Sequence, residues 1–378
     1  SDSDIALSKL FLVRDHRAVS KRTEYETLYQ HGPFQLAIVP EPGLLADVKH
    51  VGIQPITRSM IVTEVPKGPP AKRSVPVEEV LKKIDQTRYG EYLTLLAGNE
   101  DLPTRYACSP QSVTAHDAIV KAFEEIDLDE LVTDQKFSIP SDACEWRCNQ
   151  NSGLNIIGKI TGKTRPNDYY VVGAHYDSIT DETNPCKASA GANDNASGVA
   201  GVLELANVFN EFTTDASIIF VAFGGEELDL YGSKKFVNKI VKDGERKNIK
   251  SFVVLDMISY YKGKQKIYVE GGKKTKEQKQ AVDMIVANTT TYTDLAVEYS
   301  YDFQSENHGN SDHVSFLKEK MPGALIIEWD SDTYPYTHTS KDNIKYQQLP
   351  YAIEVLKVAA ATLAQAGVNI QETRKERH

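Results

Sequence analysis

The sequence lacks the features that mark several large protein classes. No stretch approaches the roughly 18 consecutive apolar residues of a membrane-spanning helix, so we expect no membrane partner. Acidic residues outnumber basic ones by 53 to 43, and the net charge of −10 argues against nucleic acid as a partner. The GxSxG motif is absent, which disfavours a serine hydrolase. An internal repeat and extended low-complexity segments are absent too, so the 378 residues have the composition of a globular protein.

Cysteine is scarce, with four residues in the chain. An even number fits disulfides in an oxidising compartment. Cys144 and Cys148 have no second Cys/His pair at zinc-finger spacing, which disfavours a structural zinc site. We predict a local bridge between Cys144 and Cys148, which leaves Cys108 and Cys186 as the other pair.

Two further features bear on the compartment. The chain begins at Ser1 without Met and carries no signal peptide, as a processed form would. Asn288-Thr289-Thr290 is a glycosylation sequon, and Asn195-Ala196-Ser197 fits the same pattern. We expect a secreted, extracellular protein, or one in another oxidising compartment such as the vacuole.

A proline-rich, basic stretch at residues 65–76 is the best candidate for a linker. It separates an N-terminal part, residues 1–75, from a larger domain over residues 76–378. The N-terminal part has no cluster of catalytic residue types, and we predict a small α+β module or a pro-segment. Its short apolar runs lie at residues 9–13, 34–39 and 60–62.

After the linker, apolar runs and helical patterns alternate along the chain. This alternation predicts an α/β three-layer sandwich with a mostly parallel central sheet. We expect strands at residues 154–160, 169–174, 217–223, 251–257 and 323–329, and helices at 77–96, 113–126, 198–212, 233–241, 276–287 and 349–366.

Two adjacent carboxylates, Glu226 and Glu227, follow the apolar run at residues 217–222. Neighbouring side chains on an extended segment point in opposite directions. One carboxylate could therefore bind a metal ion while the other moves a proton, as metal-assisted hydrolysis requires. Glu-Glu pairs are also common on solvated surfaces, so this pair gains its meaning from the other segments of the chain.

Further potential metal ligands follow the other predicted strands. In open α/β sheets, sites collect at the carboxyl ends of strands. Taken singly, each residue has an ordinary alternative, such as a turn, a helix N-cap or an exposed histidine. Together, two histidines and three carboxylates suit a pair of zinc ions. These five candidates are His175, Asp194, Glu227, Asp256 and His338.

The five segments resemble the metal-site motifs of the co-catalytic di-zinc aminopeptidases, above all the secreted leucyl aminopeptidases of bacteria and fungi. The likeness covers roughly residues 76–367 in the same order and leaves the N-terminal part outside it. The motifs read GAHYDS at 173–178, GANDNASG at 191–198, FGGEE at 223–227, LDM at 255–257 and YTHT at 336–339.

This resemblance implies a set of zinc ligands. Asp194 would bridge two zinc ions. His175 and Asp256 would complete the protein ligands of one ion, and Glu227 and His338 those of the other. The larger domain would then be a catalytic domain that holds two Zn²⁺ ions.

The resemblance also implies roles for the neighbours of these ligands. Glu226 would be the general base, and Asp177 would accept the free ring N–H of His175. Asp312 lies in a segment that also matches the family and would support the site, whereas we do not expect His313 to be a ligand. The segment Asn193-Asp194-Asn195 is a departure, because many relatives carry Asp-Asp there.

The implied function is that of a zinc aminopeptidase, a monomeric hydrolase that cleaves the N-terminal residue from peptides with a free N-terminus. Met257, Ile258, Phe316 and the tyrosines near His338 could line a pocket for an apolar residue such as Leu, or could be core and rim residues. Two alternatives are a glutaminyl cyclase-like transferase with one zinc ion and a non-catalytic, peptidase-like ectodomain. Both are disfavoured because all five ligand positions and the base are filled.

Overall fold

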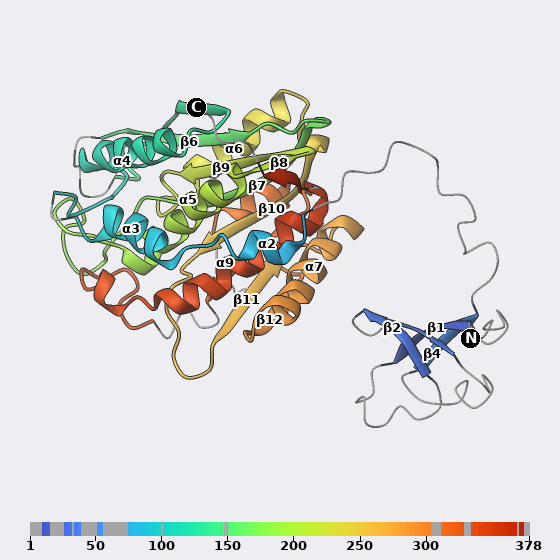
Figure 1. Cartoon of the computed structure of the whole chain (residues 1–378). Helices are drawn as coiled ribbons and strands as arrows, with labels where there is room; N and C mark the ends of the chain where they lie inside the picture. The colour runs from blue at the N-terminus through green and yellow to red at the C-terminus, as the bar shows by residue number, and fades with distance from the viewer. Residues whose placement is uncertain are drawn as a thin grey trace. The chain divides into compact units, whose positions relative to one another are not determined.

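The computed structural model describes four strands within residues 10–55, and residues 75–373 except 100, 145, 147, 149, 304–310, 329–333 and 369. The chain divides into two compact units, Ser1–Lys72 and Arg73–His378 (Figure 1).

The first unit contains an antiparallel sheet with the strand order β2-β3-β1-β4. Two of the predicted apolar runs fall on β1 and β3, whereas residues 60–62 and the linker up to residue 74 lie outside the described residues. The role of this unit, as a pro-segment or an accessory module, stays a prediction. The strands are β1 (Leu10–Asp15), β2 (Glu26–His31), β3 (Phe34–Ile38) and β4 (Val51–Pro55).

An eight-stranded mixed sheet forms the centre of the second unit, in the order β12-β11-β13-β10-β7-β9-β6-β5. Its four middle strands run parallel, while β6, β5 and β11 pair antiparallel with their inner neighbours. The strands are β5 (Glu130–Ser138), β6 (Ser152–Ile160), β7 (Arg165–His175), β9 (Ala216–Phe223), β10 (Ile249–Asp256), β11 (Lys266–Gly271), β12 (Ala296–Ser300) and β13 (Gly323–Glu328). A small separate sheet pairs β8 (Phe212–Thr214) with β14 (Ile370–Thr373).

Helices cover both faces of this sheet (Figure 1). Alternate residues of the buried strands enter two different cores, as period-two side chains must. On β9, for example, Phe220 packs into the core beneath α5 and α9, and Val221 packs into the core beneath α6 and α8. The predicted α/β three-layer sandwich is therefore confirmed. The helices are α2 (Val77–Leu81), α3 (Gln86–Ala97), α4 (Gln111–Ile126), α5 (Ser197–Asn210), α6 (Tyr231–Lys242), α7 (Lys276–Tyr292), α8 (His313–Lys318) and α9 (Leu349–Leu363).

The single helix predicted at residues 77–96 is two helices. Asp85 separates them, because its side chain accepts hydrogen bonds from the backbone amides of Thr87 and Arg88 and so caps the start of α3. Among the described residues, no helix is both long enough and apolar enough to cross a membrane.

The disulfide pairing differs from the prediction. Cys108 is bonded to Cys144, and Cys148 to Cys186, so the predicted pairs Cys144–Cys148 and Cys108–Cys186 are wrong. The segment between β5 and β6 lies against the connection before α4, where the amide of Gln150 donates to the carbonyl of Cys108. It also reaches the loop after β7, so its two cysteines meet different partners.

The sequon at Asn288 lies inside helix α7. Asn288 is only 2% exposed, and its amide donates to the hydroxyl of Thr362 at 3.2 Å. Asn195 of the second sequon is fully buried. Neither side chain is accessible for glycosylation in the folded chain.

Candidate metal centre

The parallel strands bring the predicted ligands to one edge of the sheet. His175 is the last residue of β7 and pairs with Phe223, the last residue of β9, while Asp256 ends β10. Glu226 and Glu227 follow three and four residues after β9. Carboxyl ends of neighbouring parallel strands thus collect these side chains, as expected for an α/β site.

Two triads of side chains meet at this edge. His175 Nε2 lies 3.4 Å from Asp194 Oδ1 and 3.5 Å from Asp256 Oδ1. His338 Nε2 lies 3.3 Å from Asp194 Oδ2 and 3.1 Å from Glu227 Oε2. These spacings are close to the ~3.3 Å expected between two atoms that bind one tetrahedral zinc ion at ~2.0–2.1 Å. The ligand atoms of each triad lie within 4.8 Å of one another, and Asp194 belongs to both triads.

The electrostatics of the triads fit a cation. Glu227 Oε1 and Asp256 Oδ1 are buried oxygens without a hydrogen-bond partner, a costly arrangement that a metal ion would relieve. Burial disfavours ionised Asp194, yet its bonds to His175 and His338 outweigh burial and lower its pKa. Hydrogen bonds to Asp194 and Glu227 raise the pKa of His338 to about 11. A metal ion would displace such protons from the imidazoles when it binds.

Glu226 lies beside the two triads, and with His175 and Glu227 it forms a third group of side chains that could hold a metal ion. Its Oε2 is 3.9 Å from His175 Nε2, and the residue is 9% exposed. Burial raises the pKa of Glu226 well above its usual range, and the nearby carboxylates of Glu227 and Asp312 add to this, while His175 opposes it. A raised pKa makes the ionised carboxylate a stronger base, which suits this side chain to take up a proton.

Asp177 holds the turn that carries the two glutamates. Its carboxylate accepts the backbone amide of Glu226 at 3.0 Å and that of Glu227 at 3.2 Å. His175 Nδ1 is 3.2 Å from the backbone carbonyl of Asp177 and 3.7 Å from its carboxylate. The ring nitrogen is therefore closer to the carbonyl than to the carboxylate that we predicted as its acceptor.

The loop that carries Asp194 is fixed by two buried carboxylates that the sequence did not reveal. Asp342 accepts the amides of Asn193 at 2.9 Å and Asp194 at 3.0 Å. The side-chain amide of Asn193 donates to both oxygens of Glu328, at 3.1 and 3.0 Å. Its Oδ1 accepts the amide and the hydroxyl of Ser259, at 3.2 and 3.1 Å. Only an amide side chain can donate and accept in this way, so Asn193 suits its surroundings better than Asp would.

We expect Asn193→Asp to destabilise the protein by about 1–3 kcal/mol at neutral pH, the usual cost of an unsatisfied buried polar group. The new carboxylate would face the carboxyl group of Glu328, whose pKa burial already raises well above its usual range. Protonation of residue 193 or Glu328 relieves the repulsion between them, so the decrease in the free energy of unfolding should become smaller as the pH falls. The double variant Asn193→Asp/Glu328→Gln restores a donor and should recover most of the stability. Denaturant unfolding at two pH values measures the free energy of unfolding of both variants. An equal decrease in the single and the double variant would contradict the prediction.

The segment 311–313 contributes a charge but no ligand to the triads. Asp312 is one of the carboxylates whose repulsion raises the pKa of Glu226. His313 is fully buried, with Nε2 3.5 Å from Glu270 Oε1, and it belongs to none of the potential metal-binding groups among the described residues.

The candidates for a substrate pocket separate into two groups. Ile258 and Phe316 are fully buried in the core, where Phe316 stacks on Phe252 with ring centroids 4.6 Å apart. Tyr336 and Tyr346 stack at 4.2 Å and are both partly exposed, near His338 in sequence. Met257 and Tyr334 are buried in the core too, at 4% and 2% exposed. The core alternative is therefore correct for these two residues as for Ile258 and Phe316, whereas Tyr336 and Tyr346 stay candidates.

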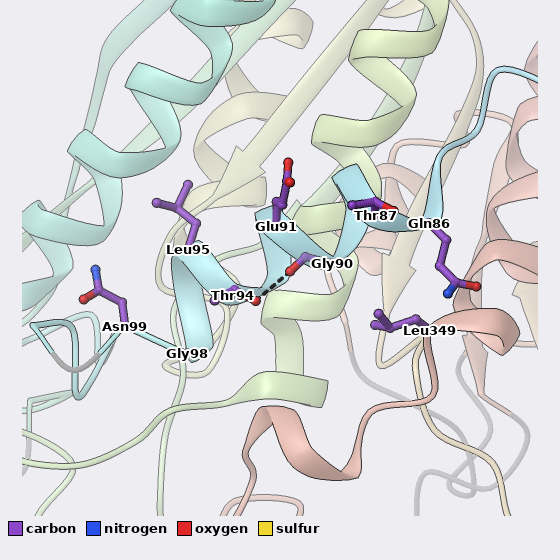
Figure 2. A pocket seen from close by; sticks show the side chains of 9 residues that line it. All are labelled: Gln86, Thr87, Gly90, Glu91, Thr94, Leu95, Gly98, Asn99 and Leu349. Atoms are coloured by element: carbon purple, nitrogen blue, oxygen red, sulfur yellow. Dashed lines mark hydrogen bonds between the residues drawn. The ribbon is translucent and has the colours of Figure 1, made fainter.

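A separate pocket of about 790 Å³ lies along α3, between that helix and Leu349 (Figure 2). Its side chains include Leu95 and one carboxylate, Glu91, and no imidazole or thiol. None of the residues of the two triads lines it, so this pocket is distinct from the candidate metal centre.

A model of the peptidase family M28 matches residues 155–363, which is more than half of the chain. The chain belongs to this family. Its mixed sheet and the two triads at the sheet edge agree with a metallopeptidase, and the resemblance to bacterial and fungal aminopeptidases is confirmed.

Two curated relatives illustrate this similarity. The chain is 27% identical over 228 residues to a probable leucine aminopeptidase of Trichophyton verrucosum, covering 58% of this chain and 59% of that protein. It is 32% identical over 203 residues to aminopeptidase YwaD of Bacillus subtilis, covering 52% and 41%. The chain thus spans about half the length of these relatives.

Solved structures show the same fold at low identity. The aminopeptidase from Aneurinibacillus sp. strain AM-1 has a TM-score of 0.62 and 19% identity, covering 79% of this chain and 99% of that one. A glutaminyl cyclase from Bacteroides thetaiotaomicron has a TM-score of 0.58 and 16% identity, covering 75% and 98%. Two proteins with different names share the fold, so the reaction must be argued from the site.

Proposed function

We propose that this chain is a di-zinc aminopeptidase that hydrolyses the first peptide bond of peptides with a free N-terminus. The observation that carries this proposal is the position of Asp194, whose two oxygens each face a different histidine. One carboxylate between two ligand sets is suited to bridge a pair of metal ions. The names of the relatives support an aminopeptidase reaction.

Asp194 would bridge the two ions. His175 and Asp256 would hold one ion, and Glu227 and His338 the other. Imidazole nitrogens and carboxylate oxygens in sets of three, with room for a further ligand, are the donors of catalytic zinc sites. When bound, the two ions would polarise the scissile carbonyl and lower the pKa of the attacking water.

Glu226 would act as the general base. It would take a proton from the attacking water, a step that its raised pKa favours, and would then pass this proton to the leaving amine nitrogen. The amide of Glu226 bonded to Asp177 would keep the carboxylate directed at the site. Asp177 would thus position the base and Glu227 through their backbone.

For the substrate we propose an apolar N-terminal residue such as Leu, in agreement with the relative named as a leucine aminopeptidase. The partly exposed tyrosines near His338 offer apolar surface for it. We further propose a secreted protein, because two disulfides suit an oxidising compartment. We also propose that it acts as a monomer.

A second candidate is a glutaminyl cyclase-like transferase, which the likeness of fold favours. Such an enzyme would use one zinc ion. The second ligand set, with His175 and Asp256, argues against it, because a single ion leaves these two side chains without a role.

Metal analysis combined with hydrolysis of an aminoacyl-anilide panel tests the proposal. We expect two zinc ions per chain and the fastest hydrolysis of apolar residues such as leucine. A chelator should abolish hydrolysis and added zinc should restore it. N-acetyl-leucine anilide is the matched control and should not be cleaved. One zinc ion together with cyclisation of N-terminal glutamine would favour the transferase instead.

A further inference from the structure

A fully buried arginine, Arg105, lies between the loops that carry the proposed zinc ligands. It belongs to the connection between α3 and α4 and has an exposed fraction of 0%. This side chain takes no part in either triad, and nothing in the local sequence around residue 105 marks it as part of the site. Burying a charge is costly unless it is compensated, so its presence there requires a reason.

The guanidinium group of Arg105 joins two ligand-bearing loops. Its Nε donates to the carbonyl of Tyr176, the residue after His175, at 2.6 Å. Its Nη2 donates to the carbonyl of Gly191 at 2.9 Å, and its Nη1 to the carbonyl of Ala190. These two carbonyls lie three and four residues before Asp194.

A further contact fixes the arginine itself. Nη1 also donates to the carbonyl of Leu96 at the end of α3, at 3.2 Å. The backbone amide of Arg105 donates to the hydroxyl of Ser178, which in turn donates to the carbonyl of Ser189 at 2.6 Å. The same two loops are thus joined a second time beside the guanidinium.

All hydrogen bonds of the guanidinium within the described residues end on backbone carbonyls. Its counter-charges are the nearby carboxylates of the site, led by Asp342, Asp177 and Asp194, which favour its charged form. Burial lowers the pKa of Arg105 to about 10, so the group stays charged at neutral pH. The arginine therefore holds two loops by geometry while its charge balances the acidic site.

We propose that Arg105 is a positioning residue that sets the spacing between His175 and Asp194, and thereby the affinity of the metal position they share. This inference rests on the proposed zinc function. Arginine is required because its planar group presents donors in a fixed fork that reaches several carbonyls at once. A lysine keeps the charge but has a single donor atom on a flexible stem.

The test compares Arg105→Lys and Arg105→Met with the control Arg88→Met. Arg88 bonds the buried carboxylate of Glu204 at 2.7 Å and lies outside the triads, so its loss lowers stability without touching the ligand loops. Zinc affinity is measured by competition with a chromophoric chelator, and thermal unfolding is recorded with and without zinc. Arg105→Lys is the milder change should Arg105→Met fold poorly.

We expect both Arg105 variants to bind zinc about 10–100-fold more weakly than the wild type. A decrease of this size is usual when a residue that holds the metal ligands in place is lost. Arg88→Met should retain the wild-type affinity. Wild-type affinity in Arg105→Lys would show that charge alone is needed, and would overturn the positioning role. Wild-type or tighter affinity in Arg105→Met, with only a lower Tm, would equally overturn it.

Hydrogen exchange of the metal-free chain provides a measurement that does not depend on zinc. In Arg105→Lys the amides of segments 176–178 and 189–194 should exchange faster than in the wild type, and those of Arg88→Met should not. Unchanged exchange in both segments would overturn the inference even if zinc binds as proposed. A wild-type chain that binds fewer than two zinc ions would instead refute the proposed function, whatever the exchange shows.

Discussion

Glu226→Gln is expected to leave zinc binding intact and to lower kcat by about 10²–10⁴-fold, the usual contribution of a general base. Glutamine has nearly the same shape as glutamate and keeps the packing of a side chain that is only 9% exposed. It cannot accept the proton of the attacking water. The amide of residue 226 still bonds Asp177, so the turn should keep its conformation.

Glu227→Gln is the matched control, because it makes the same chemical change one residue away. Glu227 Oε2 faces His338 at 3.1 Å, so this variant should weaken binding of one zinc ion as well as lower activity. Zinc content and single-turnover hydrolysis are measured for both variants. If Glu226→Gln kept most of the wild-type kcat, or if it lost a zinc ion while Glu227→Gln did not, the two roles would have to be exchanged.

Asp194→Ala is expected to have the largest effect on metal binding. Asp194 contributes one oxygen to each triad, at 3.4 Å from His175 and 3.3 Å from His338. Its loss should therefore lower the zinc affinity of both positions. The decrease should exceed the about 10–100-fold that is usual when a residue hydrogen-bonded to a metal ligand is lost. Hydrolysis should fall as well.

His338→Ala provides the comparison, because His338 belongs to only one triad. We expect this variant to keep one tightly bound zinc ion, whereas Asp194→Ala should retain none at the same free zinc concentration. Metal analysis after dialysis against a weak chelator measures both. Circular dichroism establishes that each variant is folded. A single ion in both variants would mean that Asp194 is a ligand of one position only.

The edge of the sheet that carries the candidate metal ligands could be predicted, because the strands that end there are apolar runs in the sequence. Strand β9, for instance, is buried along its whole length, so its sequence carries a strong signal and its end is easy to locate. Parallel strands then bring such ends together without further information. The outer strand β5 was missed because it is largely exposed and has no apolar run.

The supporting contacts could not be predicted, since they join residues that are distant in the sequence. Arg105 bonds the carbonyl of Gly191, 86 residues later, and Asn193 bonds Glu328 across 135 residues. No local pattern encodes such pairs. The disulfides illustrate the same limit, because four cysteines allow three pairings and the sequence does not choose between them.

In the proposed di-zinc site, the carboxylate of Asp194 would also link the two metal positions thermodynamically. An ion that fixes this side chain from one side alters the free energy with which the other side binds its own ion, and the effect must be reciprocal. Occupancy of the pair would then follow a coupled isotherm rather than the sum of two independent ones. Where zinc is scarce, positive coupling would enrich the empty and the doubly loaded chains, and negative coupling would enrich the half-loaded ones.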